Sequence, residues 1–488
     1  MNKIKLQKII EQQLTNTLNS SFIPELVSKN NYYRGKVREN YSLGDKRLMI
    51  TTDRVSAFDY VLGTVPFKGQ ILNEIAAHFL EQTKSIAENA LLSTPDPNAF
   101  VMKEVSPLKI EAIVRAYITG SMARDYFDDG KKTKCGIPLV KYLKHNKRNE
   151  RLKELLFTPT TKADAGHDED ISEEEMVKQK LTTVKQLKTI KEKSFELFRF
   201  GESFAKKQNL ILVDTKFEWG IDNDGDLIVI DEILTPDSSR YWYADSYEKL
   251  YKEEKSQKEL SKEFLRQQLI ENGYDIHGNK PPILTDEMRI NTSLRYIELY
   301  EQLLGKEFIP SSENATKRLY NNLKTNGIIK GYFVPIIAGS PADDEHCKKI
   351  QSELNKRGIP NEYRICSAHK EPMRLAKMIE EYDTSIEPIV YVTVAGRSNG
   401  LSGVTAANTK FPVIACPPYS EKFGGADIYS TLRMPSGVPV MTITETENVG
   451  FAIQKMFAMN DDALTDKTMV ELVAMKKRNE DADSQRRN

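Results

Sequence analysis

The chain has 488 residues, 39% of them hydrophobic and 29% charged, so we expect a soluble globular protein. This length is too great for one ordinary core, so two domains are expected, with three as the alternative. Lys+Arg and Asp+Glu both total 70, and a net charge of zero argues against a nucleic-acid or anionic-membrane partner, because such partners select a basic excess. The N-terminal MNKIKLQKIIEQQL is charged throughout, and no apolar run reaches the length of a membrane span. Four cysteines without metal-ligand spacing fit a reducing cytoplasm.

Three zones follow one another along the chain. Residues 32–240 mix β-rich runs with helical stretches, and 173–208 is expected to be one long amphipathic helix because its apolar side chains recur at helical spacing. Residues 241–326 are dense in charge and helical, with an interruption at GYDIHGNKPP. From VPIIAGS onward, apolar runs alternate with glycine turns and helices, which predicts a doubly wound parallel sheet. The tail after about residue 475 is expected to be disordered.

The stretch LVDTKFEWGIDNDGDLIVIDEIL (212–234) predicts two antiparallel strands joined by a turn at DNDGD. Lys216 and Glu218 are two residues apart and therefore share a strand face, and Asp231 on the returning strand can lie opposite Glu218. Because two adjacent carboxylates repel, a cation is expected between them, and Mg²⁺ carrying nucleotide phosphates is one interpretation. A surface ladder of lysine and acidic side chains without a ligand is the alternative.

Loops with basic and hydroxyl side chains precede and follow this hairpin. YYRGKVREN (32–40) places a glycine between basic residues, and VRAYITGS (114–121) ends a probable strand in Gly-Ser. FTPTTKADAGHDED (157–170) is polar, and TPDSSR (235–240) ends in an arginine after two serines. Basic and hydroxyl groups at strand ends are suited to binding phosphates and carboxylates.

Together, the segments RGKVRENY, TDRVSAFD, VRAYITGS, TPTTKADAGHDE, DTKFEWG and DEILTPDSSR resemble the phosphoribosylaminoimidazole-succinocarboxamide synthase (SAICAR synthetase) family. The resemblance implies an α+β fold of two subdomains around an ATP-grasp-like cleft. It also implies a reaction in which ATP activates the imidazole carboxylate of carboxyaminoimidazole ribonucleotide (CAIR). The amine of L-aspartate then attacks, which gives SAICAR, ADP and phosphate.

The resemblance assigns roles to residues at matching motif positions. The implied ATP-binding residues are Lys36, Arg38, Lys162, Glu218 and Asp231, of which Glu218 and Asp231 would also hold Mg²⁺. The implied CAIR-binding residues are Arg115, Ser121, Asp168, Lys216, Arg240 and Arg266, and Lys216 would also be catalytic. One helix departs from the family pattern: LSKEFLRQQL (260–269) has Ser261 and Glu263 where the family has Asp and Gln, although Lys262 and Arg266 match.

A second candidate site lies in the loops that follow the strands of the predicted parallel sheet. Gly339 and Ser340 would offer donors at a helix N-terminus, and Asp343 follows in the first turn, where a helix cap is the alternative role. His369 follows the second strand, and VAGRSNGLSG (394–403) is a glycine-rich loop after the third. The carboxyl ends of parallel strands share one edge of the sheet, so these loops are expected to meet there.

IIAGSPADDEHC, IPNEYRICSAHKEP, VAGRSNGLSGVTAANT and FPVIACPP resemble the aminoimidazole ribonucleotide (AIR) carboxylase family, and MPSGVPVMT extends the match. The resemblance implies a flavodoxin-like three-layer αβα domain that assembles as a homo-octamer. The loop AGRSNGLSG, in place of an AAHLPG form, resembles the animal-type enzyme, which uses CO₂ directly, without biotin or ATP, to convert AIR into CAIR. Ala342 departs from the pattern, which has a serine there.

This second resemblance also assigns roles. The implied AIR- and CO₂-binding residues are Gly339, Ser340, Asp343, Ser367, His369, Gly396, Arg397, Ser398 and Asn399. His369 would take the proton displaced from the imidazole ring carbon, and Lys370 and Ser398 would complete the catalytic set.

The expected organisation is a synthetase domain (1–325), a linker (326–332), a carboxylase domain (333–475) and a disordered tail (476–488). Two such domains in one chain resemble the cytoplasmic, animal-type bifunctional enzyme of purine biosynthesis, in which the product of one site is the substrate of the other. Two alternatives stay open: an active synthetase with an impaired carboxylase domain, and a non-catalytic nucleotide-binding protein.

Overall fold

The computed structural model of the chain describes residues 3–27, 31–58, 60–162, 168–260, 263–274, 281–311 and 313–487. The chain forms two compact units: unit 1 is Met1–Asn19 with Ser28–Asn322, and unit 2 is Ser20–Val27 with Leu323–Asn488. The sequence assigns all of residues 1–325 to one domain, whereas the structure groups a short N-terminal segment with the C-terminal unit.

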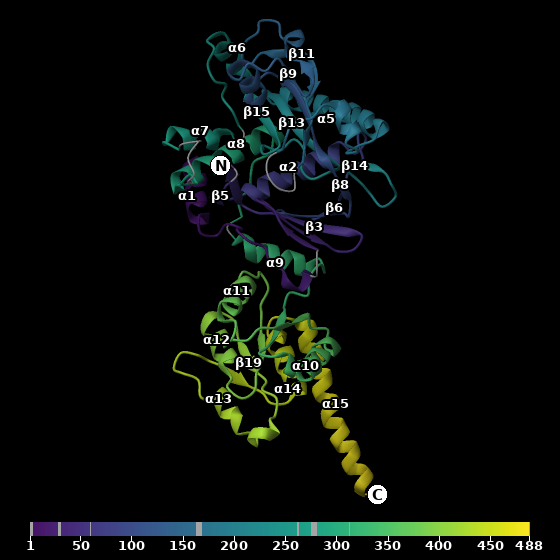
Figure 1. The fold of residues 1–488 in the computed structure, drawn as a ribbon, viewed down its shortest axis with the longest axis vertical. Coiled ribbons are helices and arrows are strands. Elements are labelled where there is room, and N and C mark those ends of the chain that lie inside the picture. The colour runs from purple at the N-terminus through teal and green to yellow at the C-terminus, as the bar shows by residue number, and fades with distance from the viewer. Residues whose placement is uncertain are drawn as a thin grey trace. The chain divides into compact units, whose positions relative to one another are not determined.

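Unit 1 contains two main antiparallel sheets (Figure 1). The first has the order β1-β2-β3-β7-β6, with bounds Tyr32–Arg34, Arg38–Ser42, Lys46–Thr51, Ala99–Lys103 and Leu91–Asp96. The second has the order β11-β8-β13-β14, with bounds Arg151–Phe157, Ser106–Tyr117, Leu210–Ile221 and Leu227–Ile230. In the second sheet, β12 (Thr160–Thr161) pairs with β8, and β15 (Ser239–Tyr243) pairs with β13. Two further hairpins are formed by β4 (Arg54–Ala57) with β5 (Tyr60–Thr64) and by β9 (Thr133–Lys134) with β10 (Ile137–Pro138).

Helices cover these sheets, and most of them share the main hydrophobic core of unit 1 with the strands, while others pack in smaller clusters. Their bounds are α1 Lys3–Gln13, α2 Lys68–Gln82, α3 Gly120–Ala123, α4 Glu173–Lys178, α5 Val184–Lys207, α6 Ala244–Lys252, α7 Glu263–Glu271, α8 Asp286–Leu304 and α9 Ala315–Thr325. The longest, α5, packs on β13 through buried side chains that recur at helical spacing, among them Leu187, Ile190 and Leu197.

The predicted single helix over 173–208 is wrong, because the chain breaks between α4 and α5. Lys180 has a left-handed φ of 58°, which no continuous helix contains. Thr183 then starts α5 with a capping box: its hydroxyl accepts the Gln186 N–H at 3.2 Å, and the Gln186 side chain accepts the Thr183 N–H at 2.9 Å. Thr183 thus specifies a new helix start.

The predicted hairpin over 212–234 is confirmed as β13 and β14, but its register differs from the expectation. Glu218 pairs with Ile230, so Asp231 is one residue beyond the expected pairing. Asp231 also follows the last residue of β14 and has a φ of 63°. The left-handed residue turns the chain out of the ladder, a feature that strand alternation does not reveal.

Unit 2 contains one sheet of five parallel strands in the order β17-β16-β18-β19-β20, which is the 2-1-3-4-5 order of flavodoxin-like folds. The strands are β16 Val334–Ala338, β17 Asn361–Ile365, β18 Tyr391–Val394, β19 Val413–Ala415 and β20 Met441–Thr442. The helices are α10 Asp344–Lys356, α11 Pro372–Asp383, α12 Gly400–Asn408, α13 Tyr429–Leu432, α14 Thr446–Ala458 and α15 Asp462–Arg487. Figure 1 shows α10 and α14 on one side of the sheet and α11 and α12 on the other. The predicted three-layer αβα domain is confirmed.

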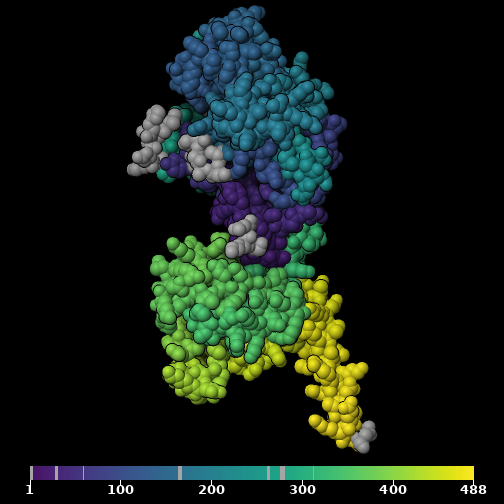
Figure 2. Space-filling model, turned by 45° about the vertical axis from the view of Figure 1, so that its right-hand side comes forward, coloured from purple at the N-terminus to yellow at the C-terminus, as the bar shows by residue number. Residues whose placement is uncertain are grey.

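The tail of the chain is helical, whereas the sequence predicts disorder from residue 476. In α15, Leu464 and Thr468 are buried near the start, and the part after residue 475 is exposed. Figure 2 shows the end of this helix standing clear of the rest of unit 2. Charged side chains with good helix propensity continue the helix without packing. The prediction of disorder was based on low hydrophobicity, which does not exclude an exposed helix.

The segment 20–27 joins unit 2 through backbone contacts and buried side chains. Phe22 forms a parallel bridge with Ser385, and its carbonyl accepts the Ile386 N–H at 3.0 Å. The N–H of Glu25 donates to Glu387 Oε2 at 3.3 Å, and Glu387 is 1% exposed. Burial, together with the Glu25 carboxyl group, raises the pKa of Glu387 far above its usual value, so this pair keeps a proton.

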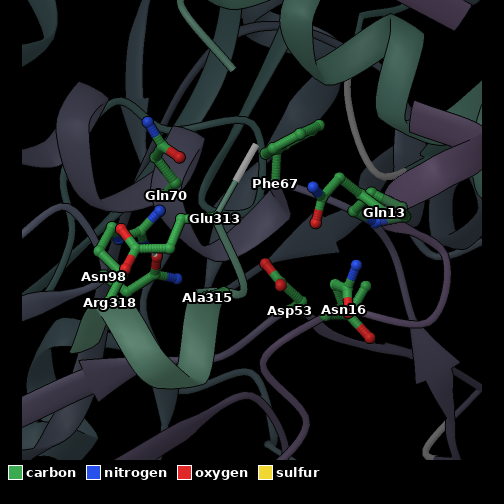
Figure 3. Close-up of a pocket in the computed structure, with 11 residues that line it drawn as sticks. Gln13, Asn16, Asp53, Phe67, Gln70, Asn98, Glu313, Ala315 and Arg318 are labelled. Carbon is green, nitrogen blue, oxygen red and sulfur yellow. Dashed lines mark hydrogen bonds between the residues drawn. The ribbon is translucent and has the colours of Figure 1, made fainter. Parts of the chain in front are cut away.

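A small polar cavity in unit 1 lies where α1, α2 and α9 approach the end of β3 (Figure 3). Asp53 lies beside it and accepts the N–H groups of Leu18 at 2.8 Å and Gly69 at 2.9 Å. Burial raises the pKa of Asp53 to about 6 against these hydrogen bonds. The cavity volume of about 10 Å³ suits a single water molecule, so this cavity is not a substrate site.

No helix among the described residues is long and apolar enough to cross a membrane.

Candidate functional site

The first candidate site is built on one face of the β8–β13 strand pair. Asp214, Lys216 and Glu218 alternate along β13 and therefore share a face. The register places Asp214 opposite Arg115 of β8 and Glu218 opposite Glu111. A row of charged side chains thus crosses both strands, and we call these five residues the charged ladder.

Lysine side chains neutralise Glu218 in this ladder. The ammonium of Lys216 donates to Glu111 Oε1 at 2.6 Å and to Glu218 Oε1 at 3.1 Å, and Lys162 donates to Glu218 Oε2. Burial would raise the pKa of Glu218, but Lys216 and Lys162 outweigh it and lower the pKa to about 2. Burial would also lower the pKa of Lys216, yet Glu218 and Glu111 raise it above its usual value. Both groups stay charged at neutral pH.

Asp231 is held by an arginine from the first sheet. Arg38 Nη1 lies 2.9 Å from Asp231 Oδ1, and Arg38 Nη2 lies 2.7 Å from Glu232 Oε2. Burial raises the pKa of Asp231, and the neighbouring charge of Glu218 adds to this while Arg38 opposes it. The charges of Glu218 and Asp231 thus influence each other, and each carboxylate is paired with cationic side chains: Glu218 with Lys162 and Lys216, and Asp231 with Arg38.

The residues present fit a divalent metal ion bound together with phosphate. The buried Oδ1 of Asp231 is ion-paired with Arg38 Nη1 at 2.9 Å, but this contact lacks hydrogen-bond geometry, so the oxygen keeps capacity for a further ligand. Glu218 is ionised, as a metal ligand must be. No group of three or more His, Cys, Asp or Glu side chains with metal-site geometry occurs in the described part of the chain. Two carboxylates are the set that Mg²⁺ uses when phosphates and water supply its other ligands.

A cavity of about 260 Å³ opens beside the charged ladder. It is lined by Ile113, Arg115, Asp214, Thr215, Lys216, Pro236, Asp237, Ser238, Ser239, Arg240 and Arg266. Its four cationic side chains outnumber its two carboxylates, which suits an anionic ligand. The structure thus brings together four of the predicted CAIR-binding residues.

Asp214 orients two arginines of this cavity, and it was not among the site residues predicted from the sequence. Arg115 Nη1 donates to its Oδ2 at 2.9 Å, and Arg240 Nη1 donates to the same oxygen at 2.5 Å. Gly120, with a φ of 57°, permits this arrangement, because a Cβ there would lie 2.6 Å from Arg240 Nη2. The available signal was that Asp214 precedes Lys216 by two residues and so shares its strand face.

The loop TPDSSR is anchored by a buried lysine. Lys68, at the start of α2, has no exposed surface and donates to Asp237 Oδ2 at 2.8 Å. The hydroxyl of Tyr296 on α8 donates to Asp237 Oδ1 at 2.5 Å. Because both helices hold Asp237, the position of Arg240 three residues later is also constrained.

The remaining predicted residues of this site have varied placements. Lys36 lies in the bend before β2, where its carbonyl accepts from Arg54 Nε at 3.1 Å, and Ser121 Oγ lies 3.4 Å from Arg115 Nη2. Asp168 is exposed. Ser261 and Lys262 lie outside the described residues.

The second candidate site lies at the carboxyl edge of the parallel sheet in unit 2. Three loops follow the adjacent strands β16, β17 and β18, and the structure brings them together. A Cβ on Gly400 would lie 2.9 Å from His369 Nε2, so the third loop touches the second. A Cβ on Gly339 would lie 3.4 Å from that of Ala395, so the first loop touches the third.

Side chains in the first two loops fix their local shapes. Ser340 Oγ accepts the N–H of Ala342 at 3.2 Å, and Ser367 Oγ accepts the N–H of Lys370 at 3.3 Å. Asp343 stands at the start of α10 but makes no capping hydrogen bond with its side chain, which disfavours the purely structural role. Burial raises the pKa of Asp343, and the nearby Arg397 opposes this rise.

Polar side chains of the second and third loops differ in their exposure to solvent. Arg397, Ser398 and His369 are exposed, whereas Asn399 is buried and caps α12 by accepting the Ser402 N–H at 3.1 Å. An exposed imidazole that touches the loop at Gly400, close to the backbone donors at the start of α12, is suited to binding an anionic, nitrogen-containing ring.

Comparisons with known proteins give a family match for each of the two units. A family model described as SAICAR synthetase matches residues 31–281, and one described as AIR carboxylase matches residues 333–479. The phosphoribosylaminoimidazole-succinocarboxamide synthase of Cytophaga hutchinsonii is 44% identical over 302 residues, which cover 61% of this chain and 96% of that protein. The synthase of Flavobacterium psychrophilum is 46% identical over 281 residues, which cover 57% of this chain and 88% of that protein.

A solved structure supports the fold of unit 1. The SAICAR-synthase from Saccharomyces cerevisiae, complexed with SAICAR, is 28% identical and superposes with a TM-score of 0.52, covering 60% of this chain and 99% of that chain. The match to the first family model spans more than half of the chain. The chain therefore belongs to the SAICAR synthetase family and carries an AIR carboxylase domain in the same polypeptide, the organisation of a bifunctional enzyme of purine biosynthesis.

Proposed function

We propose that the two units catalyse consecutive reactions, with the roles of individual residues as follows. Unit 2 carboxylates AIR with CO₂ to give CAIR, and unit 1 condenses CAIR with L-aspartate, using ATP, to give SAICAR, ADP and phosphate. The observation that carries the proposal is the anion-suited cavity beside the charged ladder. A non-catalytic nucleotide-binding protein would need neither this cavity nor the exposed His369 beside the glycine-rich loop.

In unit 1, the cavity residues Arg115, Arg240 and Arg266 bind the phosphate and carboxylate of CAIR, while Lys36, Arg38 and Lys162 bind the phosphates of ATP. Glu218 and Asp231 would hold Mg²⁺, which neutralises phosphate charge and orients the nucleotide. A carboxylate oxygen of CAIR attacks the γ-phosphorus, and ADP leaves. The aspartate amine then attacks the acyl carbon, so that the C–N bond forms, the C–O bond to phosphate breaks, and the amine releases a proton to solvent as phosphate leaves. Lys216 remains cationic between the two substrates, where it offsets their converging negative charges.

In unit 2, Ser340, Asp343 and Ser367 bind the ribose phosphate and the amino group of AIR. A new C–C bond forms between the ring carbon and CO₂, and the ring proton leaves for the imidazole of His369. Lys370, Ser398 and the backbone of the third loop bind the forming carboxylate. The imidazole ring of AIR supplies the electron pair for the new C–C bond, so the reaction balances without ATP or biotin.

Purified full-length protein tests the proposal in two steps. Incubated with AIR and bicarbonate, it should form CAIR, and added MgATP and L-aspartate should then convert CAIR into SAICAR. SAICAR formed only from added CAIR would identify an impaired carboxylase unit, and nucleotide binding without either product would identify the non-catalytic alternative. Removal of Mg²⁺ with EDTA should stop the second step and leave the first unchanged.

We further propose that the enzyme is a cytoplasmic homo-oligomer, an octamer by family resemblance. On α15, Met469, Val470 and Val473 are 56%, 69% and 61% exposed. Apolar side chains at this spacing form a stripe that association would cover. Four free thiols are compatible with a reducing compartment. Sedimentation analysis of the wild type and of Val470→Glu tests the assembly, because the charged variant should dissociate.

A further inference from the structure

The glycine-rich loop of unit 2 is held by a second segment, which no motif singled out. This segment, 427–431, lies in η6 (Ala426–Ile428) and α13, far along the chain from the loop at 395–400. Its side chains bond mainly to the backbone of the loop, so the loop shape depends on them whatever side chains the loop carries.

Asp427 and Ser430 make the contacts. The N–H of Arg397 donates to Asp427 Oδ2 at 2.9 Å, and the N–H of Asn399 donates to Ser430 Oγ at 3.0 Å. The hydroxyl hydrogen of Ser430 has two acceptors in reach, the carbonyls of Arg397 at 3.1 Å and of Asp427 at 2.8 Å. Thr431 Oγ1 also accepts from Asn399 Nδ2 at 2.9 Å. Both peptide groups that flank Ser398 are therefore held from one side.

The held conformation is an unfavourable one for its residue. Arg397 has a left-handed φ of 58°, which a residue with a Cβ adopts at a cost of about 1 kcal/mol or more. Such a conformation persists only where surrounding contacts determine it. A carboxylate that accepts the Arg397 N–H is a strong contact of this kind, because hydrogen bonds to charged groups exceed neutral ones in strength.

The loop so held carries the groups of the candidate site. Asn399, at its end, caps α12, and Gly400 follows it directly. The backbone at Gly400 approaches His369 so closely that a Cβ would lie 2.9 Å from Nε2. A shift of the loop would therefore change the position of both Ser398 and the imidazole.

We propose that Asp427 and Ser430 are positioning residues of the carboxylase reaction, which fix the loop 396–400 against His369. This inference rests on the proposed function of unit 2. The two residues act through the loop backbone, and the loop contacts the substrate. Without the Asp427 carboxylate, Arg397 relaxes to an ordinary φ and the loop populates arrangements in which Ser398 and His369 no longer face a common substrate.

The test compares three variants of the full-length protein. Asp427→Ala removes the acceptor, Asp427→Asn keeps an acceptor oxygen at the same place, and Glu421→Ala removes an exposed carboxylate from the same β19–α13 connection. Asp427→Ala should lower kcat for CAIR formation by about tenfold to hundredfold, with a smaller change in KM for AIR. Asp427→Asn should retain kcat within about threefold, and Glu421→Ala should match the wild type. SAICAR formation from added CAIR should be unchanged in all three.

Hydrogen exchange at the Arg397 amide gives a readout that does not depend on activity. Exchange should accelerate in Asp427→Ala and stay slow in Asp427→Asn. Should Asp427→Ala unfold unit 2, Ser430→Ala carries the same test, with accelerated exchange at the Asn399 amide and a lowered kcat.

Three results would overturn the inference: wild-type kcat in Asp427→Ala, an equal loss of kcat in Asp427→Asn and Asp427→Ala, or unchanged amide exchange in a slow variant. If the wild type itself forms no CAIR from AIR and CO₂, the proposed function of unit 2 fails instead.

Discussion

Replacing Gly400 by alanine tests whether His369 and the glycine-rich loop form one site. A Cβ at this position would lie 2.9 Å from His369 Nε2 and 3.1 Å from Cε1, whereas ordinary contacts begin at 3.4 Å. The imidazole must therefore move by about 0.5 Å, and since a 1 Å misplacement costs about a hundredfold in rate, we expect about a tenfold loss of kcat for CAIR formation. This loss corresponds to about 1.4 kcal/mol in activation free energy.

Stability distinguishes this effect from a folding defect. Gly400 is the first residue of α12 and has no left-handed φ, so alanine should leave the unfolding temperature unchanged or raise it. Gly403→Ala is the matched control, because it makes the same change in the same helix and meets only the flexible end of Met434 at 3.2 Å. CAIR formation by steady-state assay should fall in Gly400→Ala alone. A Gly400→Ala variant with the wild-type rate would refute the placement of His369 beside the loop as a catalytic arrangement.

Two further predictions concern buried carboxyl groups. Asp214→Asn removes the charge shared by Arg115 and Arg240, so those guanidinium groups lose their orientation. KM for CAIR should rise by about tenfold or more, while CAIR formation stays unchanged. Steady-state kinetics of both reactions check this, and an unaltered KM would contradict it. Glu387→Gln should change how stability depends on pH. The folded chain keeps a proton on the Glu25–Glu387 pair, whereas the unfolded chain releases it above about pH 4.5. The wild type should therefore lose about 1.4 kcal/mol of unfolding free energy per pH unit between about pH 4.5 and the raised pKa of folded Glu387. Denaturant unfolding between about pH 6 and about pH 9 should show this slope in the wild type and a smaller one in Glu387→Gln, and equal slopes would refute the shared proton.

The sequence predicts those features that follow from repeated patterns. Alternating apolar runs and glycine turns identify the parallel sheet and its strand-end loops, and the alternation in DTKFEWG correctly places Lys216 and Glu218 on one face. The same alternation places Asp214, two residues before Lys216, on this face. The hydrogen-bonded partners of these residues, such as Lys162 for Glu218, come from loops whose path no local pattern specifies.

Other features depend on contacts between distant segments. β14 ends at Ile230, opposite Glu218, and the left-handed Asp231 leaves the ladder directly after it; no strand pattern indicates a single residue of that kind. The segment 20–27 has no helical or strand periodicity, so no sequence pattern predicts that it packs in unit 2. Asp427 lies in an irregular connection, and only its hydrogen bond to the Arg397 amide reveals its role.

Two chemically independent sites in one chain are the central claim, and Glu218→Gln tests this claim most directly. Supplied with AIR, bicarbonate, MgATP and L-aspartate, the variant should form CAIR at the wild-type rate and accumulate it, while SAICAR formation falls by about a hundredfold or more because the buried carboxylate that would hold the metal is neutral. Glu202→Gln, which alters a carboxylate of α5 that is paired with Arg151 of β11, is the control and should make SAICAR normally. Equal loss of CAIR and SAICAR in Glu218→Gln, or normal SAICAR formation, would contradict the account.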